Sequence, residues 1–446
     1  MKSWIPLSAC IAVLALGVSI AYGQGLTPRA GTVVIPDSNA QRPADIGVRS
    51  HTNYLIFVPA RKPGFDTPQG ETPGSIACIY GLVTNTAGCP IATATTLPTG
   101  GSGIIAVVDA YDYPTAESDF NYFSDYFGLP FGNQCGSSNN QPCFTKVSAT
   151  GGSFPRKDAG WALEAALDIE WAHAMAPSAQ VVLVEAASNR LSDLLDAVDA
   201  ATQTVITCNG ACSAGNGTGE VSMSWGGSEF SQEGTFDGHF TGTSGIVYTA
   251  ASGDEGGVPS WPGASPNVLC AGGTSIHRAE DGTFTGETAW IDSGGGPSAY
   301  ASRPSFQDPI SSIVGAFRGT PDLSFDSDPA SGVSVYTTTP YHGSSGWLVI
   351  GGTSAATQAL AGIINLVGTQ TSSTADELTQ IYDNYDSGFS PGPSYSYSSD
   401  LRDITEGSTA GCSVNPNRPA YSSCFSAAEG WDFVTGVGTN LGTSGK

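Results

Sequence analysis

Basic residues are scarce in this chain of 446 residues, in which 16 Lys and Arg stand against 40 Asp and Glu, for a formal net charge of −24. Without a basic run, the chain would be repelled by nucleic acids and by anionic membranes, so neither is an expected partner. The imbalance suits an acidic medium. At low pH many carboxylates are neutral, and a surface with few Lys and Arg escapes the positive self-repulsion that unfolds other proteins there.

Long apolar runs are also absent after the first 23 residues, so no later segment is expected to span a bilayer. Residues 1–23 contain one Lys, an apolar stretch and the small-residue site Ala21-Tyr22-Gly23, which together indicate a cleaved secretory signal peptide. We therefore predict a secreted, monomeric protein with no stable membrane association. Its predicted parts are the signal peptide (1–23), an N-terminal extension with no evident full-length propeptide (24–60) and one catalytic domain (61–446).

Histidine is scarce too, with five in the chain. His173 lies about half a helical turn out of phase with Glu164, so we predict that it is structural. The other four follow no recognisable catalytic or metal-binding spacing, and they are His51, His239, His277 and His342.

Cysteines occur mostly as close neighbours in loop-like segments, as expected of local disulfides formed in an oxidising compartment. Their spacing predicts four pairs, which are Cys78–Cys89, Cys135–Cys143, Cys208–Cys212 and Cys412–Cys424. Cys270 is left over in the apolar run NVLCAGGT. There we expect a buried free thiol that acts as a small hydrophobe.

Short, continuously apolar runs alternate with helical patterns from about residue 100 onward, and such runs are typical of strands buried on both faces. The runs are GIIAVVD (103–109), QVVLVEA (180–186), EVSMSW (220–225) and GIVYTAA (245–251), and the helical patterns lie at 115–126, 158–175 and 190–204. This order predicts a doubly wound α/β fold with a mostly parallel sheet and helices on both faces. Functional residues are then expected at the carboxyl ends of the strands.

The segment DAGWALEAALDIEWAHAMAP is a strong helix prediction, with Asp158 available as its N-cap. Glu164 and Asp168 fall on one side of this helix, one turn apart, and between Trp161 and Trp171. Two neighbouring carboxylates away from bulk water cannot both ionise cheaply, so the pair can hold and pass a proton. A solvated acidic face is the alternative interpretation, but no Lys lies at helical spacing to accompany it.

Two further segments place reactive side chains at favourable points of the predicted fold. In GGTSAATQALAGIINLVG, Ser354 begins an apolar helix, where the partial positive charge of the N-terminus favours a developing alkoxide. In AASGDEGG, Asp254 follows an apolar strand on a glycine-flanked turn. The structural alternatives are a helix cap for Ser354 and a turn residue for Asp254.

Together these motifs resemble the sedolisin family of serine-carboxyl peptidases, which have a subtilisin-like fold. The resemblance extends over roughly residues 100–440. It is carried, in family order, by Glu164-Ala-Ala-Leu-Asp168, by SMSWGG at 222–227, by Ser252-Gly253-Asp254 and by Gly352-Thr353-Ser354.

The resemblance implies roles for seven residues. Ser354 would be the nucleophile, Glu164 the general base and Asp168 the group that orients it. Asp254 would donate to the oxyanion, and the main chain of Ser224, Trp225 and Gly226 would pair with a protein or peptide substrate.

The resemblance also implies one structural calcium ion near the C-terminus. Its carboxylates would come from Asp403 and Asp432, and its main-chain oxygens from Ile404, Ala428 and Gly430. Oxygen ligands of this kind suit a hard cation.

One departure from the family pattern lies next to the proposed nucleophile. Gln358 stands where the family has proline, and we expect it to alter the turn after Ser354 without removing a reacting group.

A carboxylate base implies an acidic pH optimum, since a base works best when its pKa lies near the working pH. Asp254 implies the same, because only a protonated carboxyl can donate to an oxyanion. A subtilisin-like peptidase with Asp109 as its acid would need a histidine at the start of the Glu164 helix, and none is there. A glycosidase using Glu164 and Asp168 leaves Ser354 unexplained. A catalytically silent, calcium-stabilised binding protein remains an alternative.

Overall fold

The computed structural model describes residues 31–60, 66–136, 140–207, 217–242, 245–341, 343–368, 371–388, 400–412 and 423–446. The predicted signal peptide (1–23) and the predicted pair Cys208–Cys212 lie outside these residues. Within them, no helix is long and apolar enough to cross a membrane.

A large, mostly parallel sheet forms the centre of the molecule. Its strand order is β18-β19-β15-β11-β9-β7-β4-β6-β5, with β12 added antiparallel beside β11 and β18 antiparallel to β19. In chain order the strands are β4 (Ile104–Ala110), β5 (Phe144–Ser148), β6 (Gln180–Ala186), β7 (Gly219–Met223), β9 (Ile246–Ala251), β11 (Leu269–Arg278), β12 (Phe284–Ala289), β15 (Leu323–Asp326), β18 (Leu401–Arg402) and β19 (Thr439–Asn440).

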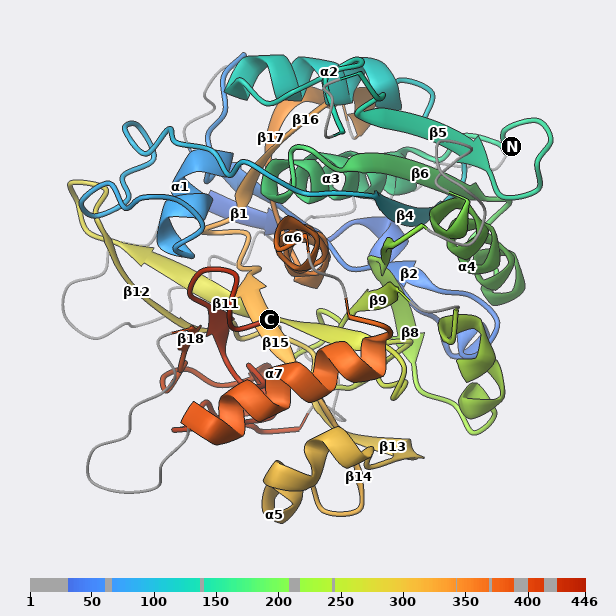
Figure 1. Ribbon diagram of the computed structural model, residues 1–446, viewed down its shortest axis with the longest axis vertical. Coiled ribbons are helices and arrows are strands. Elements are labelled where there is room, and N and C mark those ends of the chain that lie inside the picture. Colours follow the sequence, from blue (N-terminus) through green and yellow to red (C-terminus); the bar gives the residue numbers. More distant parts are fainter. Residues whose placement is uncertain are drawn as a thin grey trace, which may run out of the picture.

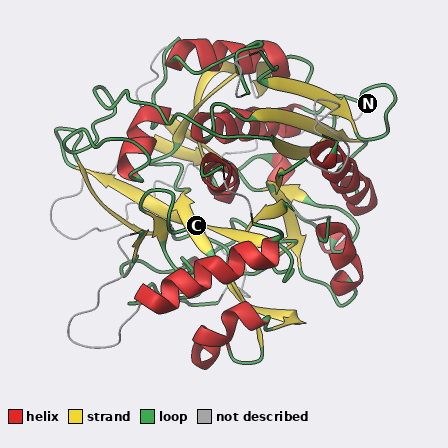
Figure 2. Cartoon of the chain, viewed as in Figure 1, coloured by secondary structure: helices red, strands yellow, loops and turns green. Residues whose placement is uncertain are grey.

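Helices pack on both faces of this sheet. The helices of the described chain are α1 (Pro73–Ile79), α2 (Ala116–Phe127), α3 (Ala159–Met175), α4 (Leu191–Ile206), α5 (Ser311–Val314), α6 (Thr353–Leu366) and α7 (Thr374–Gly388). Figure 1 shows α6 near the centre of the molecule, between α3 and the strands β11 and β15. Figure 2 shows how helices and strands interleave, with loops making up much of the remaining chain.

Strand β4 shows how the two faces are formed. Its side chains alternate, so that Ile105 and Val107 belong to the core with α3 and α6, while Ile104, Ala106 and Val108 belong to the core with α4. A strand covered on both sides must be apolar at every position, which explains the continuous apolar runs. All seven predicted strands and helices are present within two residues of their predicted bounds, and the doubly wound α/β prediction is confirmed.

Three smaller sheets flank the large one, with the orders β1-β3-β17-β16, β10-β8-β2 and β13-β14. Their strands are β1 (Gly31–Val34), β2 (His51–Thr52), β3 (Leu55–Pro59), β8 (Trp225–Ser228), β10 (Ser260–Trp261), β13 (Gly296–Ser302), β14 (Phe317–Thr320), β16 (Val333–Tyr341) and β17 (Ser344–Gly351). Short 3-10 turns connect them: η1 (Asp37–Asn39), η2 (Pro43–Asp45), η4 (Glu233–Phe240), η5 (Ser305–Ile310) and η6 (Ala410–Cys412).

The described part of the N-terminal extension does more than wrap the domain. Strand β3 pairs antiparallel with β17, and β2 pairs with β8. Tyr54 is fully buried, and Leu55 and Phe57 are also part of the core. Proline, glycine and threonine surround this short apolar run, and its partner strands lie far away along the chain. For both reasons the sequence does not indicate that it is a strand of the core.

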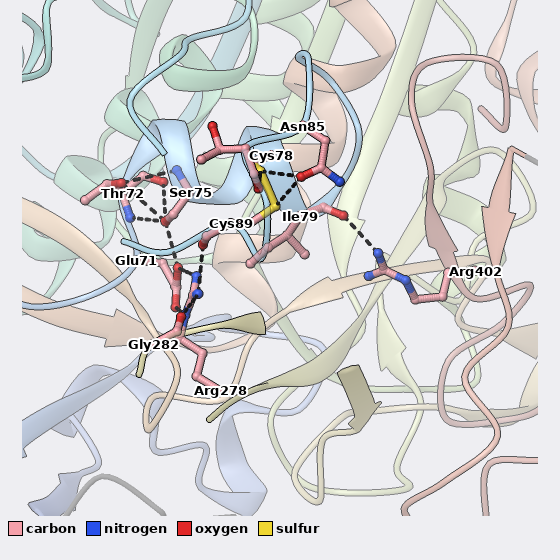
Figure 3. Close-up of a disulfide and its surroundings, with 11 residues drawn as sticks. Glu71, Thr72, Ser75, Cys78, Ile79, Asn85, Cys89, Arg278, Gly282 and Arg402 are labelled. Carbon is pink, nitrogen blue, oxygen red and sulfur yellow. Dashed lines mark hydrogen bonds and ion pairs between the residues drawn. A yellow bond between two sulfur atoms is a disulfide. The ribbon is translucent and has the colours of Figure 1, made fainter. Parts of the chain in front are cut away.

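Two predicted disulfides, Cys78–Cys89 and Cys135–Cys143, are present, and Cys424 is also disulfide-bonded. The side chain of its predicted partner, Cys412, lies outside the described residues. Cys270 is free and buried, as predicted. Figure 3 shows the Cys78–Cys89 bridge beside a buried ion pair, in which Arg278 Nε donates to Glu71 Oε1 at 2.6 Å. Arg278 also donates to the carbonyl of Cys89 at 2.8 Å, which ties this loop to β11.

Candidate active site

Glu164 and Asp168 lie on α3, which Asp158 caps by accepting hydrogen bonds from the main-chain N–H groups of Gly160 and Trp161. Both carboxyls have no exposed surface, so the solvated acidic face is excluded. The helix is buried nearly all round. Its two indoles lie in different clusters, Trp161 with α4 and Trp171 with α2 and α6.

A third carboxyl, that of Asp109 at the end of β4, joins this pair. Burial raises the pKa of Glu164 well above its ordinary value, and Asp109 raises it further, while the Ser354 hydroxyl and the Asn53 main chain lower it. Burial likewise raises the pKa of Asp168, with Asp109 and then Glu164 adding to the effect. None of the four carboxyl oxygens of Glu164 and Asp109 makes a well-formed hydrogen bond among the described residues. The raised pKa values mean that this cluster can hold protons.

Ser354 begins helix α6 and is fully buried. Its hydroxyl donates to the carbonyl of Ser224 at 3.1 Å, and its main-chain N–H donates to the carbonyl of Asn53 at 3.1 Å. Gly352 precedes it with φ of 111°, and a Cβ there would lie 2.2 Å from the Asn53 oxygen. Only glycine permits this close approach, which explains the Gly-Thr-Ser order.

Asp254 lies on the turn after β9, close to Ser354. Its Oδ1 accepts from the main-chain N–H of Thr353 at 2.9 Å and from the Thr353 hydroxyl at 2.8 Å. Its Oδ2 is buried and has no partner among the described residues. Burial raises the pKa of Asp254 to about 8, against the lowering effect of Thr353. The carboxyl is therefore protonated in acid, and because Oδ1 accepts two hydrogen bonds, the proton belongs on Oδ2.

The strand expected to pair with substrate already has a partner. Trp225 and Gly226 begin β8, and β2 pairs with it antiparallel, placing Thr52 opposite Trp225 and His51 opposite Gly226. Residues 51 and 52 of the chain itself thus occupy the hydrogen-bonding edge at which a peptide was predicted to bind.

Asn53 continues this segment to the predicted catalytic residues. Its side-chain amide donates to the carbonyl of Ser224 at 3.1 Å, and its own carbonyl accepts from the N–H of Ser354. Its main chain also lies near enough to Glu164 to lower the pKa of that carboxyl. The predicted nucleophile, its predicted base and Ser224 therefore all meet at one residue of the N-terminal extension.

Sequence reasoning missed the roles of Asn53 and Thr353 and underestimated that of Gln358. The Gln358 amide donates to Asp168 Oδ2 at 2.8 Å and to Ser224 Oγ at 2.9 Å. Gln358 lies one helical turn after Ser354, and this spacing could have placed it on the same face. No signal in the sequence could have brought Asn53 here, since its contacts are all distant along the chain.

His173 is structural, as predicted. It is fully buried, its Nε2 lies 2.7 Å from the carbonyl of Pro130, and its ring packs against Phe120. Burial lowers the pKa of His173 to about 4. It therefore stays neutral at ordinary pH.

Asp403 and Asp432 come together near the C-terminus. Asp403 Oδ2 accepts from the N–H of Gly430 at 3.1 Å, Asp432 Oδ2 accepts from the N–H of Ala428 at 3.0 Å, and Ile404 follows Asp403 as a buried residue. Asp403 Oδ1 is buried without a partner among the described residues. Within the described ranges no three His, Cys, Asp or Glu side chains gather to hold a metal. An ion here would need main-chain oxygens as well, and the residues present fit such an oxygen-only site.

No protein-family model matches the chain. It is 32% identical over 221 residues to sedolisin of Pseudomonas sp. (strain 101), a match covering 44% of this chain and 33% of that protein. It is 30% identical over 307 residues to kumamolisin of Bacillus sp. (strain MN-32), covering 63% and 49%. Tripeptidyl-peptidase 1 of Bos taurus is 29% identical over 214 residues, covering 45% and 34%. These similarities support a relationship to the sedolisin family.

The solved structure of Pseudomonas sedolisin, a serine-carboxyl proteinase complexed with two molecules of pseudo-iodotyrostatin, aligns with a TM-score of 0.61 at 22% identity. The alignment covers 84% of this chain and 96% of that one, so the sedolisin fold extends over most of the chain. With the predominantly parallel sheet, it confirms the predicted subtilisin-like architecture. The matched segments span a third to a half of the curated relatives' own lengths.

Proposed function

We propose that this protein is a secreted, acid-acting serine-carboxyl peptidase that cleaves protein or peptide substrates through an acyl-enzyme on Ser354. The observation that carries the proposal is the meeting of Ser354 with two buried carboxyls, Glu164 and Asp168, in a cluster that includes no Lys, Arg or His partner among the described residues. The similarity to sedolisin, kumamolisin and tripeptidyl-peptidase 1 supports the same reaction.

Glu164 takes the proton from the Ser354 hydroxyl as the oxygen attacks the scissile carbonyl, and later returns it to the departing amine. Asp168 orients Glu164 and shares its proton. Water then attacks the acyl-enzyme, again with Glu164 as base. Burial raises the pKa of both carboxyls, so the pair holds a shared proton that it can pass during the reaction.

Asp254 stabilises the oxyanion through the proton on its Oδ2. The main-chain N–H of Ser354 is the second donor, and it already holds a carbonyl, that of Asn53. Donors fixed in place before the reaction lower its barrier because they need no reorganisation as charge develops.

The chain's own residues 51–53 must leave before a substrate can bind in this way. They pair with β8 as an extended peptide would, and the Asn53 carbonyl lies at the Ser354 N–H. We therefore propose the Asn53–Tyr54 bond as a first substrate of the site, whose hydrolysis would free the edge of β8. This gives the short N-terminal extension a role in latency.

We further propose one structural calcium ion held by Asp403 and Asp432 with the carbonyls of Ile404, Ala428 and Gly430. When bound, the ion would neutralise two neighbouring carboxylates. The unpartnered Asp403 Oδ1 supports this assignment.

The deciding experiment compares the full chain with Ser354→Ala in acid, at about pH 3–5 from carboxylate pKa values. We expect the unaltered chain to cut a denatured protein substrate and to release a fragment ending at Asn53. We expect Ser354→Ala to do neither, with a loss in kcat of about 10⁶-fold. A properly folded chain that cleaves nothing at any pH would instead indicate a silent binding protein.

A further inference from the structure

Gln358 is fully buried on α6, one turn after Ser354, and its amide nitrogen bridges two groups of the site. One hydrogen bond runs to Asp168 Oδ2 at 2.8 Å and the other to Ser224 Oγ at 2.9 Å. Through Ser224, whose carbonyl accepts from the Ser354 hydroxyl, the bridge also reaches the nucleophile. Both amide hydrogens are thus used within the site.

Asp168 has no cation to hold its orientation. The ionisable groups that face it are Glu164 on its own helix and Asp109 from β4, both carboxyls. None of the ion pairs in the described part of the chain includes Asp168. Its fixed donor is therefore the Gln358 amide. The nearby Ser224 hydroxyl lowers the pKa of Asp168, and this hydroxyl also donates to the carbonyl of Ser354 at 3.4 Å.

We propose that Gln358 is a positioning residue, whose amide fixes Asp168 with Oδ2 as an acceptor and so reserves Oδ1 for the proton shared with Glu164. This inference rests on the proposed function. A carboxyl oxygen that accepts an N–H hydrogen bond is a poor place for a proton. Oδ1, which has no partner among the described residues, is then the proton-bearing oxygen. The Asp254 carboxyl is held in the same way: its Oδ1 accepts two hydrogen bonds from Thr353, which leaves the proton to Oδ2.

Packing alone does not explain an amide at this position. Gln358 Oε1 is buried without a partner among the described residues, which costs free energy that an apolar side chain would avoid. The family's proline would fill this part of α6 without that cost, but it would leave Asp168 without its amide donor. Compared with the family's proline, Gln358 therefore changes the proton affinity of the Glu164–Asp168 pair as well as the turn after Ser354.

The test uses the pH profile of kcat/KM for Gln358→Met, which keeps an unbranched side chain and removes the donor. Losing one hydrogen bond to the ionised carboxyl should raise its pKa, so the acid limb should move to higher pH by about one unit. We expect kcat to fall and KM to stay nearly constant. Gln358→Glu retains a donor while it is protonated, so it should recover most of the lost activity at the lowest pH values.

The matched control is Thr357→Val on the same helix, which removes a hydroxyl bonded to the carbonyl of Thr353 but touches no carboxyl. Its pH profile should keep the unaltered shape. If Gln358→Met keeps the unaltered profile, or if Gln358→Met and Gln358→Glu behave identically at every pH, the positioning role is wrong.

A second measurement needs no activity. Asp168 has a raised pKa in the folded state, so it contributes stability at low pH that is lost as pH rises through that pKa. The measurement is Tm as a function of pH, made with Ser354→Ala alone and with Ser354→Ala plus Gln358→Met. Gln358→Met should move the fall in Tm to higher pH. A Tm curve that Gln358→Met leaves unchanged would overturn the inference. If the enzyme shows no Ser354-dependent cleavage, the proposed function fails, and the Tm curves still report whether Gln358 controls Asp168.

Discussion

Two buried carboxyl sites in this protein are arranged in opposite ways. Asp322 lies against Arg318, both fully buried, with hydrogen bonds of 2.7 Å and 2.5 Å. Its two oxygens also accept from the hydroxyl of Tyr382 at 2.9 Å and from the N–H of Cys270 at 2.8 Å. At the candidate active site, Glu164, Asp168 and Asp109 share a buried space with one another and with no arginine or lysine of the described chain.

The difference separates a structural use of buried charge from a chemical one. A buried carboxylate with a cation and full hydrogen bonding holds its ionised form and fixes the fold around it. Carboxyls that face one another hold protons well above their ordinary pKa values, which costs stability at neutral pH and leaves those protons available for transfer. Three buried carboxyls with raised pKa values are therefore gathered where the proposed reaction would use them.

Removing the arginine should have the largest effect on stability. Arg318→Met leaves the Asp322 carboxylate buried without its cation, so the free energy of unfolding should fall by about 3–5 kcal/mol, as measured by chemical denaturation. The control is Arg303→Met, since the Arg303–Asp308 pair is partly exposed to solvent and should contribute no more than about 1 kcal/mol.

Removing a carboxyl from the candidate active site should instead increase the stability of the protein. Asp168→Asn keeps an acceptor for Gln358 and removes a carboxyl, so it should stabilise the fold at neutral pH while abolishing turnover. If Asp168→Asn instead destabilises the protein as strongly as Arg318→Met does, the two sites do not differ in the way described.

Asp254 allows the chemical use of a buried carboxyl to be measured by its effect on catalysis. Asp254→Ala should lower kcat by about 10²–10³-fold with little change in KM, because it removes one oxyanion donor. Burial raises the pKa of Asp254 to about 8, so its donor proton is present in acid and lost as pH rises through that value. Activity should therefore decline towards alkaline pH in the unaltered enzyme, and steady-state kinetics across pH check both statements. Near-normal kcat in Asp254→Ala, or an optimum above neutral pH, would contradict this role.

Calcium would supply the missing cation at a third carboxyl pair, Asp403 and Asp432. Chelation should lower the free energy of unfolding by about 2.7 kcal/mol for a protein held at a free calcium concentration of 100 Kd. Differential scanning calorimetry with and without chelator measures the change in Tm. Asp432→Ala should remove the response, and Asp308→Ala, at an exposed position, should keep it. No response to chelator in the unaltered chain would disprove the site.

The local features of this protein could be read from its sequence. Apolar runs and helical periodicity located β4, β6, β7, β9 and the helices between them, because each such element must bury its own side chains wherever it lies. The cap at Asp158 and the one-turn spacing of Glu164 and Asp168 are likewise properties of a single helix. The sedolisin resemblance proposed Ser354 and Asp254 as site residues by their motifs.

Tertiary structure alone decided what surrounds these residues. Burial of α3 on every side turned two neighbouring carboxyls into a proton-holding pair, and the end of β4 added Asp109 from another segment. The pairing of β2 with β8 brought Asn53 to Ser354, a contact between residues about three hundred positions apart. Gln358 looked like a change in a turn and proved to be a donor to Asp168. Periodicity and spacing describe one segment at a time, whereas hydrogen-bond partners and pKa values depend on which segments the fold brings together.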